Sequence, residues 1–240
     1  MSHPDTVVYL EHDGRVLLVN QHGIGPQLPI KGRQEIDNIM RFPTIEEVSN
    51  HGIDYEPKME IRIIFGSKVV KVVKAYPKIG WPKDWALKDN LISDNCVHPV
   101  AREAIYRSIH RLVSKVIITN DNDEILMAKV KRGHFTGYWT LPGGYMDHNE
   151  HPTTGCVRET LEELGIDIVL NQKSPTITQQ VFNDEGISFV SFTYQSTWNG
   201  AKSDMNLLTE EISDAAWFSK EEALSEAVSY FDLEAIRSLN

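Results

Sequence analysis

The chain has 240 residues, of which 41% are hydrophobic and 24% charged, and its formal net charge is −10. This is the composition of a globular protein with room for one large or two small domains. The acidic balance argues against a nucleic-acid partner, whose phosphates need a basic surface, but not against a small nucleotide. Cys96 and Cys156 do not suggest a disulfide framework or a zinc site. No signal pattern or long apolar run is present, so we expect a cytoplasmic location and no membrane partner.

The first hundred residues predict a small, β-rich α+β domain. Thr44, with Glu47 three residues later, is a capping-box pattern that begins a short helix ending near Gly52. Two hairpins are indicated by β-rich runs on either side of glycine turns: 6–11 with 15–20, and 60–65 with 68–73.

The middle of the chain predicts a linker followed by a helix. Residues 76–99 combine prolines, tryptophans and many polar residues, and we interpret them as the linking segment. Pro99 opens an amphipathic pattern that is expected to lead into the second half. We therefore divide the chain into an N-terminal domain with linker, 1–98, and a catalytic domain, 99–240. One stripe of the helix is formed by small and apolar side chains: Ala101, Ala104, Ile105, Ser108, Ile109 and Leu112.

In the second half, three glutamates share one face of a predicted helix. Pro152 is a favourable first residue and Gly165 a favourable stop. At about 100° per residue, Glu162 and Glu163 lie within roughly 60° of Glu159 on either side. The opposite side carries aliphatic residues with the spacing of a face packed on a core: Val157, Leu161 and Leu164.

These carboxylates suggest a metal site. Charges of the same sign repel unless a cation lies among them, and the segment before the helix ends in Gly143-Gly144, where bare backbone carbonyls can act as oxygen ligands. Oxygen-only ligands favour Mg²⁺ or Mn²⁺ over zinc, and such ions serve phosphate chemistry. A glutamate run alone is usually a solvated helix face, and a Leu-Pro-Gly-Gly loop alone is usually a turn. Their fixed separation favours a site.

The stretch from Gly144 to Ile166 resembles the Nudix box of the Nudix hydrolase superfamily. The softest match is Thr160, where the family more often has an aliphatic residue. The resemblance implies an α+β fold in residues 112–240, a mixed sheet sandwiched between helices, and hydrolysis of a nucleoside diphosphate linked to another moiety, with Mg²⁺ or Mn²⁺. It assigns metal binding to Glu159, Glu162, Glu163 and the carbonyl of Gly144. The expected catalytic residues are Glu159, Glu162 and an orienting residue, Arg158.

The rest of the second half agrees with this resemblance. Trp217-Phe218, followed by a helix from about Ser219, resembles the usual Nudix ending. Glu211 is a candidate late metal ligand or general base, and a solvated pair with Glu210 is the alternative. The expected strands are four β-rich runs: 112–119, 124–130, 176–182 and 187–198.

The substrate is left open by the sequence. We expect a small nucleotide derivative, with ADP-ribose or a relative as the best guess and a nucleoside triphosphate as an alternative. A sensor that binds such a metabolite without turnover is the competing class. A homodimer is expected. Phe135 is a candidate stacking residue, whereas Trp139 is as well explained as core. The candidate substrate-binding residues are Phe135, Gly143, Glu150 and Glu211.

A faint internal repeat links the two halves. The runs 8–10 and 16–19 resemble 117–119 and 125–128 in residue type, and Leu28-Pro29 is similar to Leu141-Pro142. Hairpins resemble one another, and chance is the better explanation. The alternative is that the N-terminal half is a degenerate relative that lost its metal site and serves in substrate enclosure or dimerisation. Unrelated topologies would end that idea.

Overall fold

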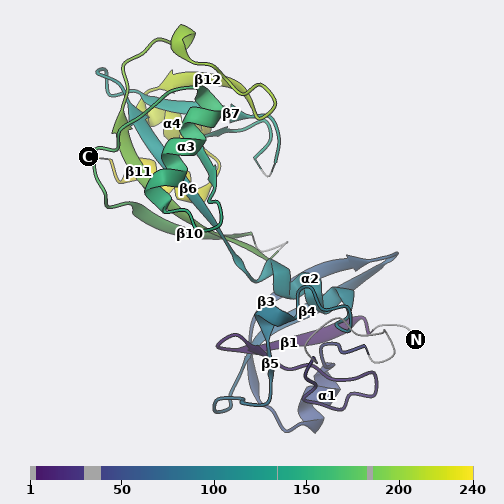
Figure 1. The fold of residues 1–240 in the computed structure, drawn as a ribbon. Coiled ribbons are helices and arrows are strands. Elements are labelled where there is room, and N and C mark those ends of the chain that lie inside the picture. Colours follow the sequence, from purple (N-terminus) through teal and green to yellow (C-terminus); the bar gives the residue numbers. More distant parts are fainter. Residues whose placement is uncertain (1–3, 30–38, 134, 183–185, 240) are drawn as a thin grey trace. The chain divides into compact units, whose positions relative to one another are not determined.

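The computed structural model describes residues 4–29, 39–133, 135–182 and 186–239. None of the described helices is long and apolar enough to cross a membrane. The chain divides into two compact units (Figure 1): Met1–Ile109 with Val181–Ser188, and His110–Gln180 with Phe189–Asn240.

The N-terminal unit is built on a five-stranded sheet. Its elements in chain order are β1 (Thr6–His12), β2 (Arg15–Val16), α1 (Ile45–Asn50), β3 (Tyr55–Phe65), β4 (Lys68–Pro77), β5 (Ala86–Leu87), the 3₁₀ helix η1 (Lys88–Asn90) and α2 (Pro99–Arg107). The strand order is β3-β4-β1-β2-β5. β1 pairs in parallel with β4, while the hairpin pairs β1–β2 and β3–β4 are antiparallel. Both predicted hairpins are present, with longer strands in the second, whereas the predicted run 15–20 forms a strand only at Arg15–Val16.

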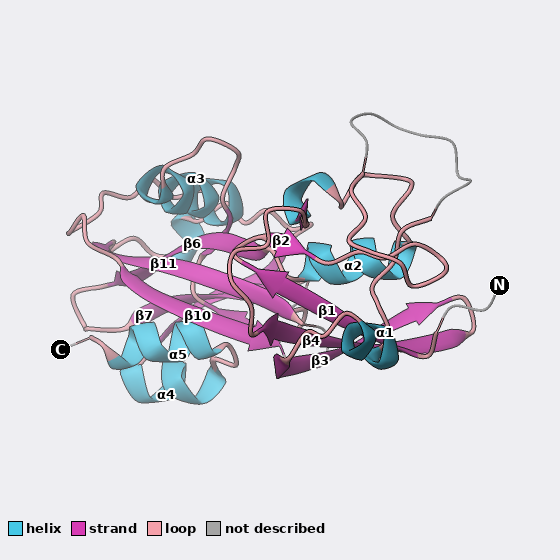
Figure 2. Ribbon diagram, turned by 90° about the horizontal axis from the view of Figure 1, so that it is seen from below, coloured by secondary structure: helices cyan, strands magenta, loops and turns pink. Residues whose placement is uncertain are grey.

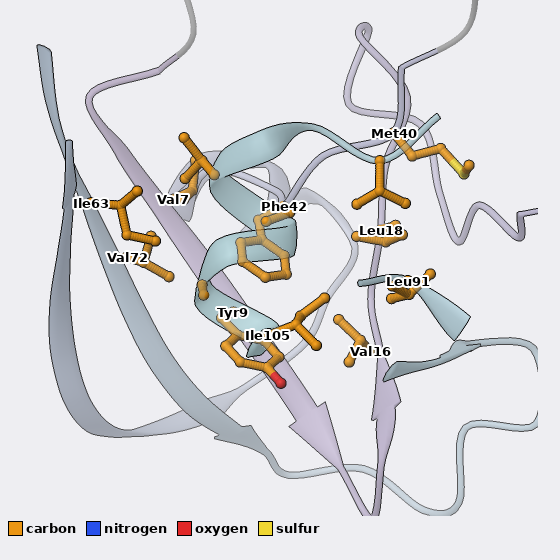
Figure 3. Packing of buried hydrophobic residues seen from close by; sticks show 14 of the residues in the cluster. Val7, Tyr9, Val16, Leu18, Met40, Phe42, Ile63, Val72, Leu91 and Ile105 are labelled. Carbon is orange, nitrogen blue, oxygen red and sulfur yellow. The ribbon is translucent and has the colours of Figure 1, made fainter. Parts of the chain in front are cut away.

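The predicted short helix of this unit is confirmed, including its cap. Thr44 Oγ1 accepts a hydrogen bond from the Glu47 backbone N–H at 3.2 Å, and Glu47 Oε2 accepts one from the Thr44 N–H at 2.8 Å. The helix places Val48 in an apolar cluster on one face of the sheet. On the other face, Tyr9 stacks on Phe42 with ring centroids 4.8 Å apart, as Figure 3 shows.

The prediction that residues 76–99 are a linker is wrong. This segment contains β5 and η1 and adds five side chains to the apolar clusters, so its prolines and polar residues lie between buried anchors rather than in a flexible connection. The helix that begins at Pro99 also packs into the core and ends at Arg107, whereas Leu112, predicted on its stripe, is 43% exposed in the next strand. The buried apolar side chains of the predicted linker are Trp85, Ala86, Leu91, Cys96 and Val97.

The C-terminal unit is built on a seven-stranded sheet. Its elements are β6 (His110–Thr119), β7 (Ile125–Val130), β8 (Trp139–Thr140), β9 (Gly143–Tyr145), α3 (Pro152–Leu164), β10 (Thr176–Phe182), β11 (Ile187–Thr197), the 3₁₀ helix η2 (Lys202–Asp204), β12 (Ile212–Phe218), α4 (Lys220–Glu226) and α5 (Tyr230–Arg237). The main path is β10-β11-β6-β7-β12, with β8 paired to β7 and β9 to β6. Figure 2 shows the helices and strands by kind. The expected last helix is present as two helices, α4 and α5.

Helices cover both faces of this sheet. Alternate residues of a strand point to opposite faces, so Val116 and Ile118 pack with α3, while Ile117 packs with α4 and α5. The β7 residues divide in the same way, with Leu126 on the first face and Met127 on the second. The sandwich of helices around a sheet, as expected from the sequence, is confirmed.

The two units share one strand order. In each, the first two strands form a hairpin, a helix follows, then a second hairpin, an edge strand and a final helix. Local hydrogen bonds match as well. The Val8 N–H donates to the Pro43 carbonyl at 2.8 Å, and the Val116 N–H donates to the Pro142 carbonyl at 3.0 Å. The two units therefore have the same strand order, so the repeat hypothesis, which unrelated topologies would have ended, stays open.

Candidate active site

The glutamate helix begins and ends where the sequence predicts. His151 caps α3 by accepting a hydrogen bond from the Thr153 N–H, and Pro152 occupies the first turn. Gly165 ends the helix in the left-handed conformation, with φ +69°, a backbone geometry that glycine adopts without steric cost. Glu159, Glu162 and Glu163 are thus held on a helix whose two ends are fixed by these capping interactions.

The buried side of α3 differs from the prediction. Leu161 is 50% exposed, and the fully buried side chains are Cys156, Thr160 and Leu164, spaced four residues apart. The hydroxyl of Thr160 donates to the Cys156 carbonyl at 2.7 Å, which satisfies it inside the core. The prediction considered only the large aliphatic residues, so it placed Leu161 on the buried side and overlooked the smaller residues Cys156 and Thr160. Glu163 therefore lies nearer the sheet than the helical wheel indicated.

The paired glycines let the backbone pass close to the helix. Gly143 has φ +129°, and a Cβ added there would meet the Ser114 carbonyl oxygen of the neighbouring strand. A Cβ on Gly144 would lie 2.6 Å from Glu159 Oε2. Gly143 therefore requires glycine for its backbone conformation, whereas a side chain at Gly144 would fit only if the Glu159 carboxylate moved. This brings the Gly144 backbone alongside the first glutamate of the cluster.

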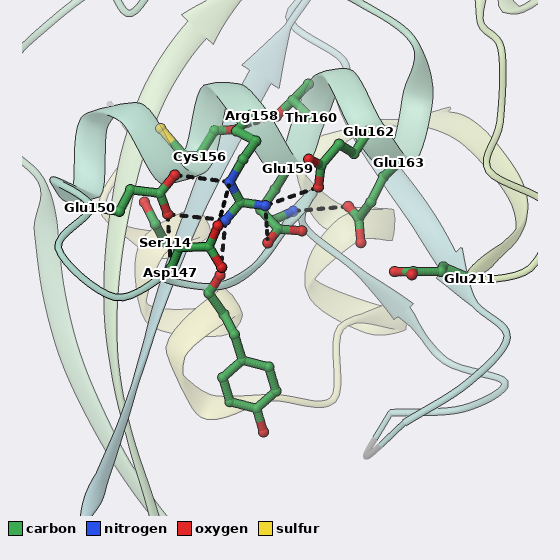
Figure 4. Close-up of polar contacts among 12 residues, drawn as sticks. Ser114, Asp147, Glu150, Cys156, Arg158, Glu159, Thr160, Glu162, Glu163 and Glu211 are labelled. Carbon is green, nitrogen blue, oxygen red and sulfur yellow. Dashed lines mark hydrogen bonds and ion pairs between the residues drawn. The ribbon is translucent and has the colours of Figure 1, made fainter.

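Arg158 lies at the centre of the carboxylates, as Figure 4 shows. Its guanidinium donates to both oxygens of Glu150, at 2.8 and 3.0 Å, and to Glu159 and Glu162, each at 2.9 Å. A fifth hydrogen bond, 3.1 Å long, reaches the Tyr145 carbonyl. The hydrogen bonds from Arg158 lower the pKa of Glu150 to about 2. The predicted orienting role of Arg158 has a geometric basis, and Glu150 is paired with Arg158 and lines a separate hollow with residues 145–149.

Glu163 lies in a different environment from its neighbours. Its Oε2 accepts a hydrogen bond from the Gly143 N–H at 3.0 Å. Burial raises its pKa to about 8, and the negative charges of Glu159 and Glu211 act in the same direction, while the Gly143 N–H and the charge of Lys115 oppose them. Burial also raises the pKa of Glu159, against the effect of Arg158. Both carboxylates would be stabilised as anions by a cation placed between them.

The donor set fits a hard divalent ion. Glu159, Glu163 and the Gly144 carbonyl supply oxygen ligands only, which suits Mg²⁺ or Mn²⁺. Within the described residues, no three His, Cys, Asp or Glu side chains already converge as a metal-holding group. The hydrogen bonds explain why these carboxylates stay apart. Arg158 binds Glu159 and Glu162 on one side, while Glu163 accepts a hydrogen bond from Gly143 on the other.

A cavity of about 320 Å³ opens beside Glu163, Gly143 and Gly144. Glu211 also lines it and forms an ion pair with Arg132, and Figure 4 shows the Glu211 carboxylate directed toward Glu163. Glu210 is exposed. The cavity has four aromatic lining residues, including the predicted stacking candidate: Phe135, Tyr145, Phe189 and Phe231. Trp139 packs instead against Phe218 in the core.

Sequence reasoning missed two charged residues of this region, Lys115 and Asp232. Lys115 lines the cavity from β6, and its Nζ lies 2.9 and 3.0 Å from the two carboxylate oxygens of Asp232 on α5. A signal was available, because Lys115 is a charged residue within the apolar run of β6 that alternation would place in the core.

Comparison with known proteins decides the family. A model of the NUDIX domain matches residues 109–239, more than half of the chain and the whole of the site described above. The chain belongs to the Nudix family.

Two curated Nudix relatives are bacterial. An 8-oxo-dGTP diphosphatase of Proteus vulgaris is 30% identical over 100 residues, which are 42% of this chain and 82% of that protein. A putative 8-oxo-dGTP diphosphatase of Bacillus subtilis (strain 168) is 37% identical over 70 residues, or 29% of this chain and 45% of that protein. A solved MutT NUDIX hydrolase from Burkholderia pseudomallei is 23% identical, with a TM-score of 0.47, and the alignment covers 55% of this chain and 99% of the other.

The site of this Nudix protein therefore has two parts. The box helix and the glycine pair supply carboxylates and a carbonyl at one end of the cavity. Aromatic rings and the Lys115–Asp232 pair, which lie outside the box, form the rest. The sequence predicted the first part from its motif and only Phe135 of the second.

Proposed function

We propose that this Nudix protein hydrolyses the pyrophosphate bond of a nucleoside diphosphate linked to another moiety, with a divalent metal ion. The observation that carries the proposal is Glu163, a half-buried carboxylate beside Glu159 and Gly144 that lines a cavity with aromatic walls. Anionic ligands at one end and aromatic rings at the other suit a metal-bound diphosphate joined to a planar base.

Glu159, Glu162, Glu163 and the Gly144 carbonyl would hold Mg²⁺ or Mn²⁺, with Glu211 as a further candidate ligand. The ion supplies, when bound, neutralisation of charge on the phosphoryl oxygens and a more acidic water. Arg158 keeps the carboxylates of Glu159 and Glu162 oriented through its fork of hydrogen bonds.

A general base is needed to take a proton from the attacking water. Among the box residues, Glu159 and Glu162 are the candidates assigned by the family resemblance, and Glu211 is a candidate from its position on the cavity wall. Glu211 is only partly buried, lines the cavity and is paired with Arg132, so its carboxylate is accessible from the cavity.

The substrate is proposed as a nucleotide with at least two linked phosphates. Two relatives carry names as 8-oxo-dGTP diphosphatases, which supports a nucleoside triphosphate beside the ADP-ribose suggested by the sequence. A hydrolysis screen of the full chain with Mg²⁺ and with Mn²⁺ tests the proposal. It should include 8-oxo-dGTP, the common triphosphates, ADP-ribose, nucleotide sugars and dinucleotides.

We expect release of a nucleoside monophosphate that stops when EDTA is added. Glu211→Gln should slow turnover more than Glu210→Gln, its exposed neighbour, if Glu211 binds metal or acts as the base. Tight binding of a nucleotide without cleavage under all metal conditions would instead support the sensor class.

We also propose that the N-terminal unit is a degenerate copy of the Nudix fold. The shared strand order and the matched Val8–Pro43 and Val116–Pro142 hydrogen bonds support this origin. We propose further that this unit encloses the substrate or mediates dimerisation. The same proposal includes a homodimeric state and a cytoplasmic location. Light scattering of the full chain and cell fractionation test the last two.

A further inference from the structure

The buried ion pair between Lys115 and Asp232 is not needed for the proposed metal site. Lys115 is 4% exposed and Asp232 is fully buried. Asp232 Oδ2 also accepts a hydrogen bond from the Leu141 N–H at 3.3 Å, and its own N–H bonds to the Ser229 hydroxyl that caps α5. Removing two charges from water is costly, and apolar replacements are often as stable. A pair placed here therefore calls for a functional reason.

The N-terminal unit shows the same fold built without such a pair. Lys115 directly precedes Val116, whose N–H bonds to Pro142, and in the N-terminal unit Val7 directly precedes Val8, whose N–H bonds to Pro43. The third residue of the last helix is Asp232 in α5 and Ala101 in α2. Val7 and Ala101 are both buried. The architecture is thus satisfied by two apolar residues at the positions that hold the ion pair.

The pair faces the aromatic part of the cavity. Lys115 Nζ lies 5.1 Å from the centre of the Phe231 ring, and Phe231 in turn meets Phe135 edge to face at 5.8 Å and Phe189 at 6.3 Å. An ammonium has three N–H donors and no acceptor. Among the described residues, one of those donors is used by Asp232 Oδ2 at 3.0 Å, whereas Oδ1, 2.9 Å away, takes part in the ion pair without a hydrogen bond. Lys115 itself lines the cavity.

We propose that Lys115 is a specificity-determining residue that donates a hydrogen bond to a carbonyl oxygen of the nucleobase, with Asp232 as its positioning residue. The base would stack among Phe135, Phe189 and Phe231 while its phosphates lie at the Glu163 end. The substrate class is then nucleotides of oxo bases such as guanine, 8-oxoguanine or uracil. Adenine carries an amino donor in place of that carbonyl. The inference rests on the proposed function, because it assumes that a nucleotide occupies this cavity.

Titration calorimetry of the full chain with GMP, AMP and ribose 5-phosphate tests the assignment without requiring turnover. The wild-type protein should bind GMP about tenfold to a hundredfold more tightly than AMP, as expected of one hydrogen bond to a charged donor. Lys115→Met removes the donor but leaves Asp232 buried without its partner. The main variant is therefore the double substitution Lys115→Val with Asp232→Ala, which installs the pair of residues found in the N-terminal unit.

The double variant should lose the preference for GMP while its affinity for AMP and ribose 5-phosphate stays within about twofold of wild type. Asp232→Asn, which keeps one carbonyl acceptor, should retain part of the preference. An unchanged ratio of GMP to AMP affinity in the folded double variant would overturn the proposal and leave the pair purely structural. An equal loss for all three ligands would also overturn it, because Lys115 would then act on phosphate.

The metal-dependent reaction is tested separately by the hydrolysis screen. A protein that cleaves nucleotides with equal efficiency for all bases, and shows no preference for GMP, keeps the proposed function and loses this inference. A protein that prefers GMP through Lys115 but cleaves no phosphoanhydride keeps this inference and loses the proposed function.

Discussion

The two units follow one strand order, yet among the residues that the structure describes only the C-terminal unit assembles a carboxylate cluster on its box helix. In the N-terminal unit the helix after the first hairpin has 6 residues, and in the C-terminal unit it has 13. The short helix carries Glu47, whose oxygens are fully used: Arg41 donates to both at 2.7 Å, and the Thr44 N–H donates to one. Its pKa is lowered mainly by Arg41. This glutamate stabilises its own helix.

The long helix uses its glutamates differently. Glu163 accepts one backbone hydrogen bond, is half-buried, and has its pKa raised by desolvation to about 8. Two additional turns and the Gly143-Gly144 pair place it beside Glu159 and the cavity. The comparison teaches that the fold supplies the sheet and the position of the helix, whereas helix length and backbone proximity at the glycines create the site.

Among the changes that distinguish the two units, Glu163→Gln should have the largest effect on turnover. The amide keeps an acceptor for the Gly143 N–H but removes the negative charge. We expect turnover in the presence of Mg²⁺ to fall by about a hundredfold or more, in the range found when a group that stabilises transition-state charge is removed. Glu162→Gln should also lower turnover by a large factor, and steady-state kinetics measures both.

The matched change in the other unit is Glu47→Gln, which should leave turnover within about twofold because Glu47 serves its helix cap and the ion pair with Arg41. Full activity of both box variants would refute the assignment of the metal site.

Gly144→Ala should have the next largest effect. The added Cβ would lie 2.6 Å from Glu159 Oε2 and would displace that carboxylate. Misplacement of a reacting group by about 1 Å can cost a hundredfold in rate, so we expect kcat to fall by about tenfold to a hundredfold. Gly80→Ala in the N-terminal unit is the control, because its Cβ would meet nothing within 4 Å. Equal kinetics of the two variants would show that the Gly144 backbone is not part of the site.

The pH dependence of stability should have opposite signs for Glu163 and Glu47. In metal-free protein, Glu163 keeps its proton up to about pH 8, whereas the ordinary value is 4.5. The native state therefore binds a proton that the unfolded state has lost, and the free energy of unfolding falls as the pH rises toward 8. Glu47, with a lowered pKa, contributes stability that is present above its ordinary pKa and lost as the pH falls.

Thermal unfolding in EDTA between pH 4 and pH 9 checks this contrast. Glu163→Gln should remove the loss on the alkaline side and raise Tm at pH 8 by roughly 5 °C. Glu47→Gln should instead lower Tm at pH 7 and flatten the acid side. A Glu163→Gln profile that runs parallel to wild type above pH 6 would contradict the protonated state of Glu163.

Motif and cap signals predicted the local elements of both units, because a cap or a glycine stop acts within a few residues. The bounds Pro152–Leu164 and the capping box at Thr44 are examples. The sequence misjudged features that depend on tertiary packing. Thr160 is buried while Leu161 is exposed, and residues 76–99 form part of a core because apolar anchors are spaced among their polar residues. The Lys115–Asp232 pair joins positions 117 residues apart, which no local pattern relates.

The smallest expected effect concerns the cap of α1. Thr44→Ala removes the hydroxyl that accepts the Glu47 N–H, and loss of such a cap costs about 1 kcal/mol. Hydrogen exchange of amides 47–51 should accelerate by about fivefold, with turnover unchanged because the carboxylate cluster belongs to the other unit. Ser49→Ala, an exposed change on the same helix that leaves the cap intact, should not accelerate exchange. If Thr44→Ala lowered turnover as strongly as Gly144→Ala, the N-terminal unit would contribute to catalysis, and the division of labour inferred from the two helices would be wrong.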